Sequence, residues 1–243
     1  MADLDNPAAR LQSVLEQVRL RASNSGPARN HWNYAFGVDD PLELAGHVAH
    51  FIQQVQLTKE LVAGLPEDED PSHLSTYFPQ LDQICDALLG VGTYNMGIFA
   101  GLVTPELLFS LGSCSRAIRR HGGREPTIDT AGLKNILTTI HEVHREIVAS
   151  DLPHTVSLFI IQRLRDVEDA VTAFTIAGYS GVESSLDALI GGASWRTPPI
   201  QQPQVGSWVK RVWTAIQSTA IGTTSIAGST QTVIESYKAI TGE

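Results

Sequence analysis

Four pairs of a capping residue and a proline constrain the fold of this chain more than any other feature of the sequence. They are Asn6-Pro7, Asp40-Pro41, Asp70-Pro71 and Thr104-Pro105. At a helix start, the capping side chain accepts a hydrogen bond from an unpaired backbone amide, and a proline in the first turn sacrifices no intrahelical bond. No segment alternates apolar and polar residues for long enough to indicate a strand. The sequence therefore predicts an all-α protein, a multi-helix bundle.

One stretch, residues 150–178, reads as the long central helix of that bundle. Asp151 and Pro153 suit the start of a helix, and Gly178 suits its end. Further helices are expected over residues 7–22, 41–63, 72–89, 104–120, 129–149 and 181–190. The apolar residues of the central helix recur every three or four positions and share one stripe: Val156, Ile160, Leu164, Val167, Val171 and Phe174.

Composition divides the chain into three parts. Residues 1–192 are expected to form the helical body, and residues 193–206 a linker rich in proline and glutamine, without helical periodicity. Residues 207–243 are expected to form a separate C-terminal amphipathic helix. Between residues 212 and 234 this tail carries no charge, and Ser, Thr and Gly interrupt its apolar positions.

Three interpretations of the tail stay open at this point. It packs back on the body, it binds a partner or a second copy, or it associates with a membrane when released. The tail is too polar for an ordinary membrane span, although its first residues resemble an interfacial anchor. The side chains expected to make these interactions are Trp208, Lys210, Arg211, Trp213, Ile216, Ile221, Ile226 and Ile234.

Charge and cysteine content exclude several classes of protein. A formal net charge of −9 argues against nucleic-acid binding, because phosphate contacts need clustered cations. The two cysteines, Cys85 and Cys114, are too few for a disulfide framework and are expected to be buried thiols. The first residues, MADLDNPAARL, lack the apolar run of a signal peptide. A cytoplasmic location is expected, with peripheral membrane association as the variant.

Two pairs of histidines are the only candidates for a metal site: His47 with His50, and His141 with His144. Histidines three residues apart project from one side of a helix and can chelate a transition metal. However, no E-x-x-H motif accompanies them, and HEVHRE is one residue short of the zinc-protease motif. The sequence therefore predicts no bound metal and no cofactor.

No arrangement of residues indicates catalysis. The chain lacks the G-x-S-x-G nucleophile elbow, and nothing singles out a general acid–base pair. The cluster Arg116, Arg119 and Arg120 at an expected helix end complements the helix dipole, and an anion site is the alternative interpretation. The protein is not expected to be an enzyme.

Several segments carry a resemblance to other proteins: NPAARLQSVL, HWNYAFGVD, LPEDED with YFPQLDQI, and residues 149–192. Over about residues 6–192 the chain resembles a widespread group of uncharacterised bacterial all-helical proteins. The resemblance implies a bacterial, cytosolic, helical protein and carries no activity with it. It also implies a variable tail, so that the part from Trp195 onward would be specialised. By analogy, such a protein is an accessory in phage defence or a toxin–antitoxin system.

The function expected from the sequence is therefore a non-enzymatic module that binds another protein or forms a homo-oligomer. The alternative is a membrane-active effector whose tail is freed from the body by a trigger. A helical metal-binding protein is the third possibility.

Overall fold

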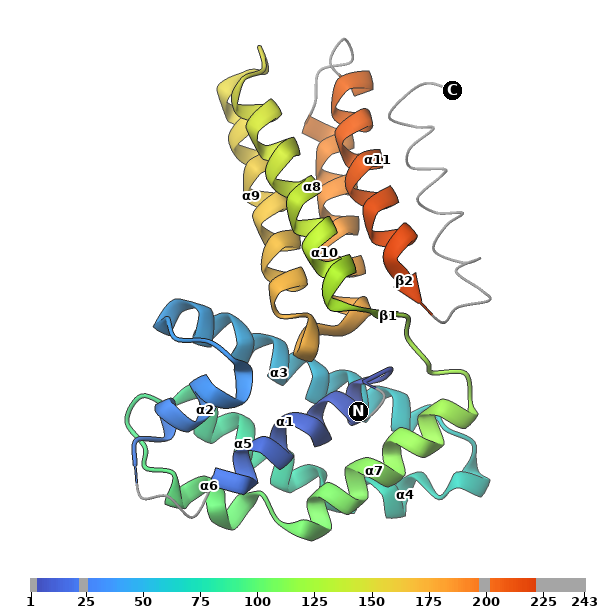
Figure 1. The fold of residues 1–243 in the computed structure, drawn as a ribbon. Helices are drawn as coiled ribbons and strands as arrows, with labels where there is room; N and C mark the ends of the chain where they lie inside the picture. The colour runs from blue at the N-terminus through green and yellow to red at the C-terminus, as the bar shows by residue number, and fades with distance from the viewer. Residues whose placement is uncertain (1–3, 22–25, 197–201, 222–243) are drawn as a thin grey trace. The chain divides into compact units, whose positions relative to one another are not determined.

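The computed structural model (Figure 1) describes residues 4–21, 26–196 and 202–221. Nearly all of this part of the chain is helical, and its only strands are the two-residue β1 (Thr127–Ile128) and β2 (Ala220–Ile221). The all-α, multi-helix fold predicted from the sequence is confirmed.

The chain folds into two compact units. Unit 1 comprises Met1–Glu125 with the short segment Thr175–Gly178, and unit 2 comprises Pro126–Phe174 with Tyr179–Glu243. The sequence predicts a single body over residues 1–192 instead. Apolar periodicity is alike on both sides of the turn that ends unit 1, so composition gives no signal of a boundary there.

Unit 1 is built around α1 (Pro7–Arg21), which packs against α3 (Pro41–Ala63) and α7 (Pro105–Arg120). Leu11 and Leu15 of α1 are completely buried in this packing. The other elements of the unit are α2 (Ala28–Phe36), η1 (Glu67–Glu69), α4 (Pro71–Leu74), η2 (Ser75–Tyr77), α5 (Phe78–Leu89) and α6 (Gly97–Leu102).

All four predicted caps begin helices of unit 1. The side chain of Asn6 accepts from the Ala9 amide at 3.0 Å, and that of Asp40 accepts from the Leu42 amide at 2.7 Å. The Asp70 and Thr104 side chains accept in the same way from amides three residues further on. Cap chemistry depends only on neighbouring residues, so these helix starts can be read directly from the sequence.

Unit 2 is a bundle of α8 (Thr130–Val148), α9 (His154–Thr172), α10 (Phe174–Arg196) and α11 (Gln202–Thr219), which lie side by side in Figure 1. Its apolar core draws on all four helices, with Ile140, Leu164, Leu186 and Val212 buried together. β1 pairs with β2 in antiparallel register, Thr127 opposite Ile221. This pairing joins the start of the unit to the end of its last helix.

The predicted central helix corresponds to α9; it starts within one residue of the predicted Pro153, whereas its predicted end at Gly178 is wrong. The helix begins at His154 after Pro153, without a side-chain cap, and it ends at Thr172. Gly178 lies inside α10, where its φ of 67° breaks the helical conformation. The apolar stripe from Val156 to Val171 is buried as predicted, in the core of unit 2.

Much of the predicted linker is helical. α10 continues to Arg196, and α11 begins at Gln202 with Pro203 in its first turn. Ala193 and Val205 are both completely buried in the core of unit 2. Burial of these side chains outweighs the weak helix propensity of the segment. Residues 197–201 lie outside the described part of the chain.

Candidate functional site

The tail residues predicted to meet a partner lie largely inside unit 2. Trp208, Trp213 and Ile216 are buried in its core, so they do not form an exposed contact surface in this structure. Indole and aliphatic side chains serve a core as well as an interface, and α11 uses them to cover the bundle. Of the three interpretations of the tail, packing against the rest of the chain describes residues 202–219. Ile226 and Ile234 lie outside the described residues, and Ile221 belongs to β2.

Polar contacts fix α11 to α8 within unit 2. The indole Nε1 of Trp208 donates to Glu146 at 2.8 Å, and Arg211 donates to Glu146 at 2.6 Å and to Glu142 at 3.2 Å. The bond from Arg211, followed by that from Trp208, lowers the pKa of Glu146. Lys210 is exposed beside these residues. Arg211, one of the cations predicted to anchor the tail, thus pairs with two carboxylates of its own unit.

The predicted anion site does not form around Arg119 and Arg120. Arg119 pairs with Asp5 at 2.7 Å, and Arg120 forms a two-bond ion pair with Glu69. The guanidinium of Arg120, followed by His121, lowers the pKa of Glu69 to about 2. Internal carboxylates therefore neutralise two of the three cations. Arg116 instead donates to the hydroxyl of Ser113 at 2.9 Å.

The histidine pairs make local contacts. His47 is buried with its Nδ1 3.0 Å from the Glu43 carbonyl, whereas the exposed His141 lies 2.7 Å from Glu168. Across residues 4–21, 26–196 and 202–221, no three His, Cys, Asp or Glu side chains are placed to hold a metal ion. Burial raises the pKa of both Cys85 and Cys114 to about 11, so neither thiol is activated as a nucleophile.

Arg10 of unit 1 is buried, which the sequence does not predict. Arg10 is 1% exposed, and it donates to both carboxylate oxygens of Glu125 at 2.9 and 3.1 Å. It also donates twice to the side-chain oxygen of Gln54 and once to the Leu4 carbonyl. Gln54 in turn donates to the Ala177 carbonyl at 3.1 Å. All five guanidinium N–H groups are used, so Arg10 has no donor left for a ligand.

The exposed face of α7, unlike the surroundings of Arg10, carries a large apolar side chain and charged groups in contact with solvent. Phe109 is 72% exposed, whereas Leu107, Leu108 and Leu111 around it on the helix are buried. Four residues at spacings of three, four and three share this outward face, and we call them the α7 stripe: Glu106, Phe109, Ser113 and Arg116. Thr104 caps the helix and Pro105 begins it, so the stripe stands on a well-fixed element.

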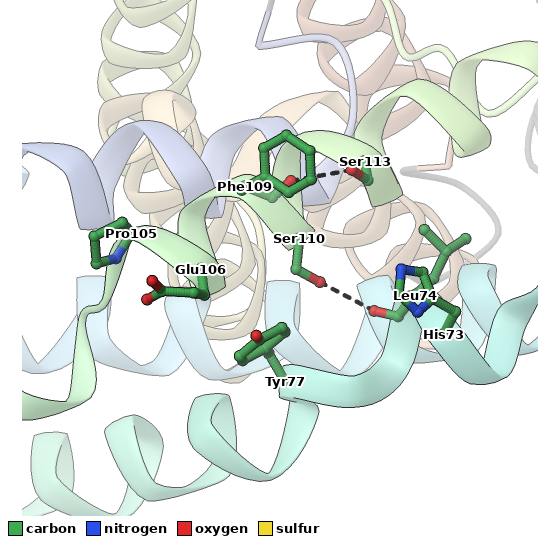
Figure 2. Close-up of a pocket in the computed structure, with 8 residues that line it drawn as sticks. All are labelled: His73, Leu74, Tyr77, Pro105, Glu106, Phe109, Ser110 and Ser113. Carbon is green, nitrogen blue, oxygen red and sulfur yellow. Dashed lines mark hydrogen bonds between the residues drawn. The ribbon is translucent and has the colours of Figure 1, made fainter.

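Phe109 stands between two hollows of unit 1. The first, of about 410 Å³, lies between α7 and the α4–η2 segment. Figure 2 shows its lining: His73, Leu74, Tyr77, Pro105, Glu106, Phe109, Ser110 and Ser113. The second, of about 620 Å³, lies toward α1 and is lined by Gln12, Glu16, Arg19, Leu20, Pro105, Leu108 and Phe109. Both volumes fall in the range of ligand and side-chain pockets.

The two serine hydroxyl groups of the first hollow donate hydrogen bonds to backbone carbonyl groups. Ser110 donates to the Leu74 carbonyl at 3.2 Å, and Ser113 donates to the Phe109 carbonyl at 3.1 Å (Figure 2). A nucleophilic serine needs a base that takes its proton, and these protons point at main-chain oxygens instead. Neither serine of this hollow is therefore arranged as an activated nucleophile.

The sequence does not distinguish Phe109 as exposed, because neighbouring apolar residues of α7 are typical of a buried core. The signal that could have found it is the helical phase. Leu107, Leu111, Cys114 and Ile118 form the inward stripe of α7, and Phe109 falls on the opposite side. A large aromatic residue opposite the apolar stripe becomes a candidate contact surface where a second exposed apolar residue adjoins it, as Leu20 does across the second hollow.

Comparison with models of protein families, with curated proteins and with solved structures found no match to this chain. Among the described helices, none combines the length and the apolar character that crossing a bilayer requires. The site must therefore be interpreted from its own geometry.

Proposed function

We propose that this chain is a helical protein-interaction module that binds a protein partner through the α7 stripe and the two hollows beside it. The observation that carries the proposal is the exposure of Phe109 between these hollows. Buried apolar surface stabilises a complex by about 25 cal/mol per Å². Aromatic residues seated in pockets are typical hot spots of protein interfaces.

Neighbouring side chains support an interface at this place. Leu20 of α1 is 76% exposed and lines the second hollow next to Phe109. Glu16 and Arg19 border the same hollow with exposed charges. An apolar centre with a charged rim is the usual composition of a protein-binding patch. Unit 1 thus offers both parts on the outer surfaces of two helices packed against each other.

The membrane and metal functions gain no support from the described residues. Trp208 and Trp213 are buried in unit 2, and among residues 4–21, 26–196 and 202–221 no group of side chains is placed to bind a metal ion. The remainder of the predicted tail, residues 222–243, lies outside the described part of the chain. A role in phage defence stays a proposal by analogy, because it depends on the partner.

Site-specific photo-cross-linking in the source organism tests the proposed function. A photoreactive amino acid replaces Ser113, at the edge of the first hollow, and is activated by light in living cells. The matched control places the same group at Leu42 of α3, which is 82% exposed in the same unit. We expect one discrete covalent protein adduct from position 113 and none from position 42.

Mass spectrometry of the adduct identifies the captured protein. Adding the Phe109→Asp substitution should remove the adduct, because a carboxylate cannot be seated in an apolar pocket without a large desolvation cost. Equal labelling from positions 113 and 42, or no adduct from position 113, would refute the proposed binding face.

A further inference from the structure

We infer that the partner of the α7 stripe is a second copy of this chain, bound with the two α7 helices antiparallel about a twofold axis. This inference rests on the proposed function and names its partner. It depends on three observations: the order of residues along the stripe, the space beside Ser113, and two charges that form no ion pair with any described residue.

The stripe is complementary to itself when it is reversed. Along α7 its residues are acidic, aromatic, small and basic, at spacings of three, four and three. In an antiparallel pair centred at Leu111, Glu106 lies opposite Arg116 of the second copy, and Phe109 lies opposite Ser113 of that copy. Each contact therefore occurs twice, as an isologous interface requires. A parallel pair would instead place like residues together.

The shape of the surface fits the same arrangement. Ser113 presents a small side chain on the stripe and lines the first hollow, of about 410 Å³ (Figure 2). The Phe109 ring of a second copy would be placed over Ser113 and at the mouth of this hollow. Packed helices lie about 8–10 Å apart, and the distance depends on the size of the side chains at the contact. With Phe109 of one copy over Ser113 of the other, the two α7 helices could pack at such a distance.

The charges of the stripe are unmatched within the described part of the chain. Across the described residues, neither Glu106 nor Arg116 forms an ion pair, although Arg119 and Arg120 at the end of the same helix both do. Glu16 and Arg19 on neighbouring α1 add one further charge of each sign. This face is therefore neutral in a chain whose net charge is −9. Two copies would repel each other over most other surfaces and meet here without that cost.

Charge reversal with a rescue by mixing tests the inference. Glu106→Arg gives a stripe with two cations, and Arg116→Glu gives a stripe with two anions. Each variant alone would place like charges opposite each other twice in the dimer. Mixed in equal amounts, the two variants restore two opposite-charge pairs. Asp86→Arg, on the exposed side of α5, makes the same change of net charge as Glu106→Arg but away from the stripe, and is the matched control for that variant.

Sedimentation velocity of the purified full chain supplies the readout, over protein concentrations from about 1 to about 300 μM, the range in which modest interfaces associate. We expect the wild type and Asp86→Arg to form dimers with similar affinity. Each reversal variant should dimerise at least about tenfold more weakly, and the mixture should recover dimers containing one copy of each. Circular dichroism verifies that both variants keep their helical content.

Two results would overturn the second-copy inference. The first is a wild type that stays monomeric across the whole range, and the second is dimerisation that both reversals leave unchanged. Neither result contradicts the proposed function if position 113 still cross-links to a different protein in cells. Loss of every specific adduct at position 113 would instead reject the binding face itself.

Discussion

Arg10 and Arg116 belong to the same unit, yet they show two opposite uses of an arginine side chain. Arg10 is buried with all five of its donors used by Glu125, Gln54 and a main-chain carbonyl. Arg116 is exposed, bonds a single hydroxyl and forms no ion pair with another described residue. A buried charge must be paired to be tolerated, whereas an exposed one can keep its charge for a partner.

The comparison extends to the residues around each arginine. The surroundings of Arg10 are closed, because Gly178 leaves no room for a Cβ beside the guanidinium. The surroundings of Arg116 are open, since the exposed Phe109 ring lies beside it with a centroid 6.0 Å from its guanidinium carbon. Closed packing fixes the fold of unit 1 around Arg10, and the open face is the contact surface proposed above.

The largest expected effect comes from removing the buried charge. Arg10→Ala leaves Glu125 and Gln54 without their shared donor, and such a change costs about 3–5 kcal/mol of folding free energy. Hydrogen exchange of peptides from α1 and α3 reports on unit 1 specifically and should show faster exchange throughout. Arg19→Ala, at an exposed position of the same helix, should change the exchange free energy by less than about 0.5 kcal/mol. Equal losses of exchange free energy in Arg10→Ala and Arg19→Ala would contradict a special role of the buried arginine in stability.

Gly178→Ala tests the closed packing beside Arg10. The added Cβ would clash with three guanidinium atoms of Arg10. In addition, φ at this position is 67°, which disfavours any residue with a side chain. We expect a loss of about 2–3 kcal/mol, from overpacking and backbone strain together. Gly46→Ala in α3 is the control, because its Cβ would meet nothing within 4 Å. There the free energy of unfolding should rise by about 0.5–1 kcal/mol.

The pair of Arg120 and Glu69 lies between these extremes, since it is paired but on the surface. Folding lowers the pKa of Glu69 from 4.5 to about 2, so the stabilisation is complete above about pH 5. It is lost progressively as the pH falls through 4.5 toward 2. Thermal midpoints of the wild type should therefore exceed those of Glu69→Gln at pH 7 and approach them by about pH 3.

Arg120→Gln should remove most of the pH dependence that Glu69→Gln removes, because it takes away the first cause of the lowered pKa of Glu69 and leaves only the contact with His121. A difference between wild type and variant that stays constant from pH 7 to about pH 3 would contradict the assignment of the stabilisation to this ion pair. A small difference is expected throughout, since solvent screens an exposed pair.

Local chemistry explains which parts of the structure could be predicted from the sequence. The four caps depend on side chains within three residues of an amide, and the buried stripe of α9 depends on helical period alone. The Arg10 network joins Arg10 to Gln54 and Glu125, which are 44 and 115 residues away in the chain. No local pattern encodes that pairing, so neither the network nor the division into two units could be read from the sequence.

The candidate site was hidden for a different reason, because the same residue types serve opposite purposes. Trp208 and Trp213 are chemically suited to a membrane anchor or a partner, yet they complete the core of unit 2. Phe109 reads as core in composition and is exposed in the structure. Which aromatic residue is buried depends on where neighbouring helices pack, and only the three-dimensional arrangement supplies that information.

Phe109→Ala should have the smallest effect on stability and still change the behaviour of the protein. Because the ring is mostly exposed and alanine favours helix, the free energy of unfolding should change by less than about 0.5 kcal/mol. Leu111→Ala, two residues away on the buried face of α7, should cost about 2–5 kcal/mol. Urea denaturation with paired variants measures both values. If Phe109→Ala proved as costly as Leu111→Ala, the ring would be packed within the chain and could not serve a partner. If instead stability is kept while cross-linking from position 113 is lost, the ring acts in binding alone.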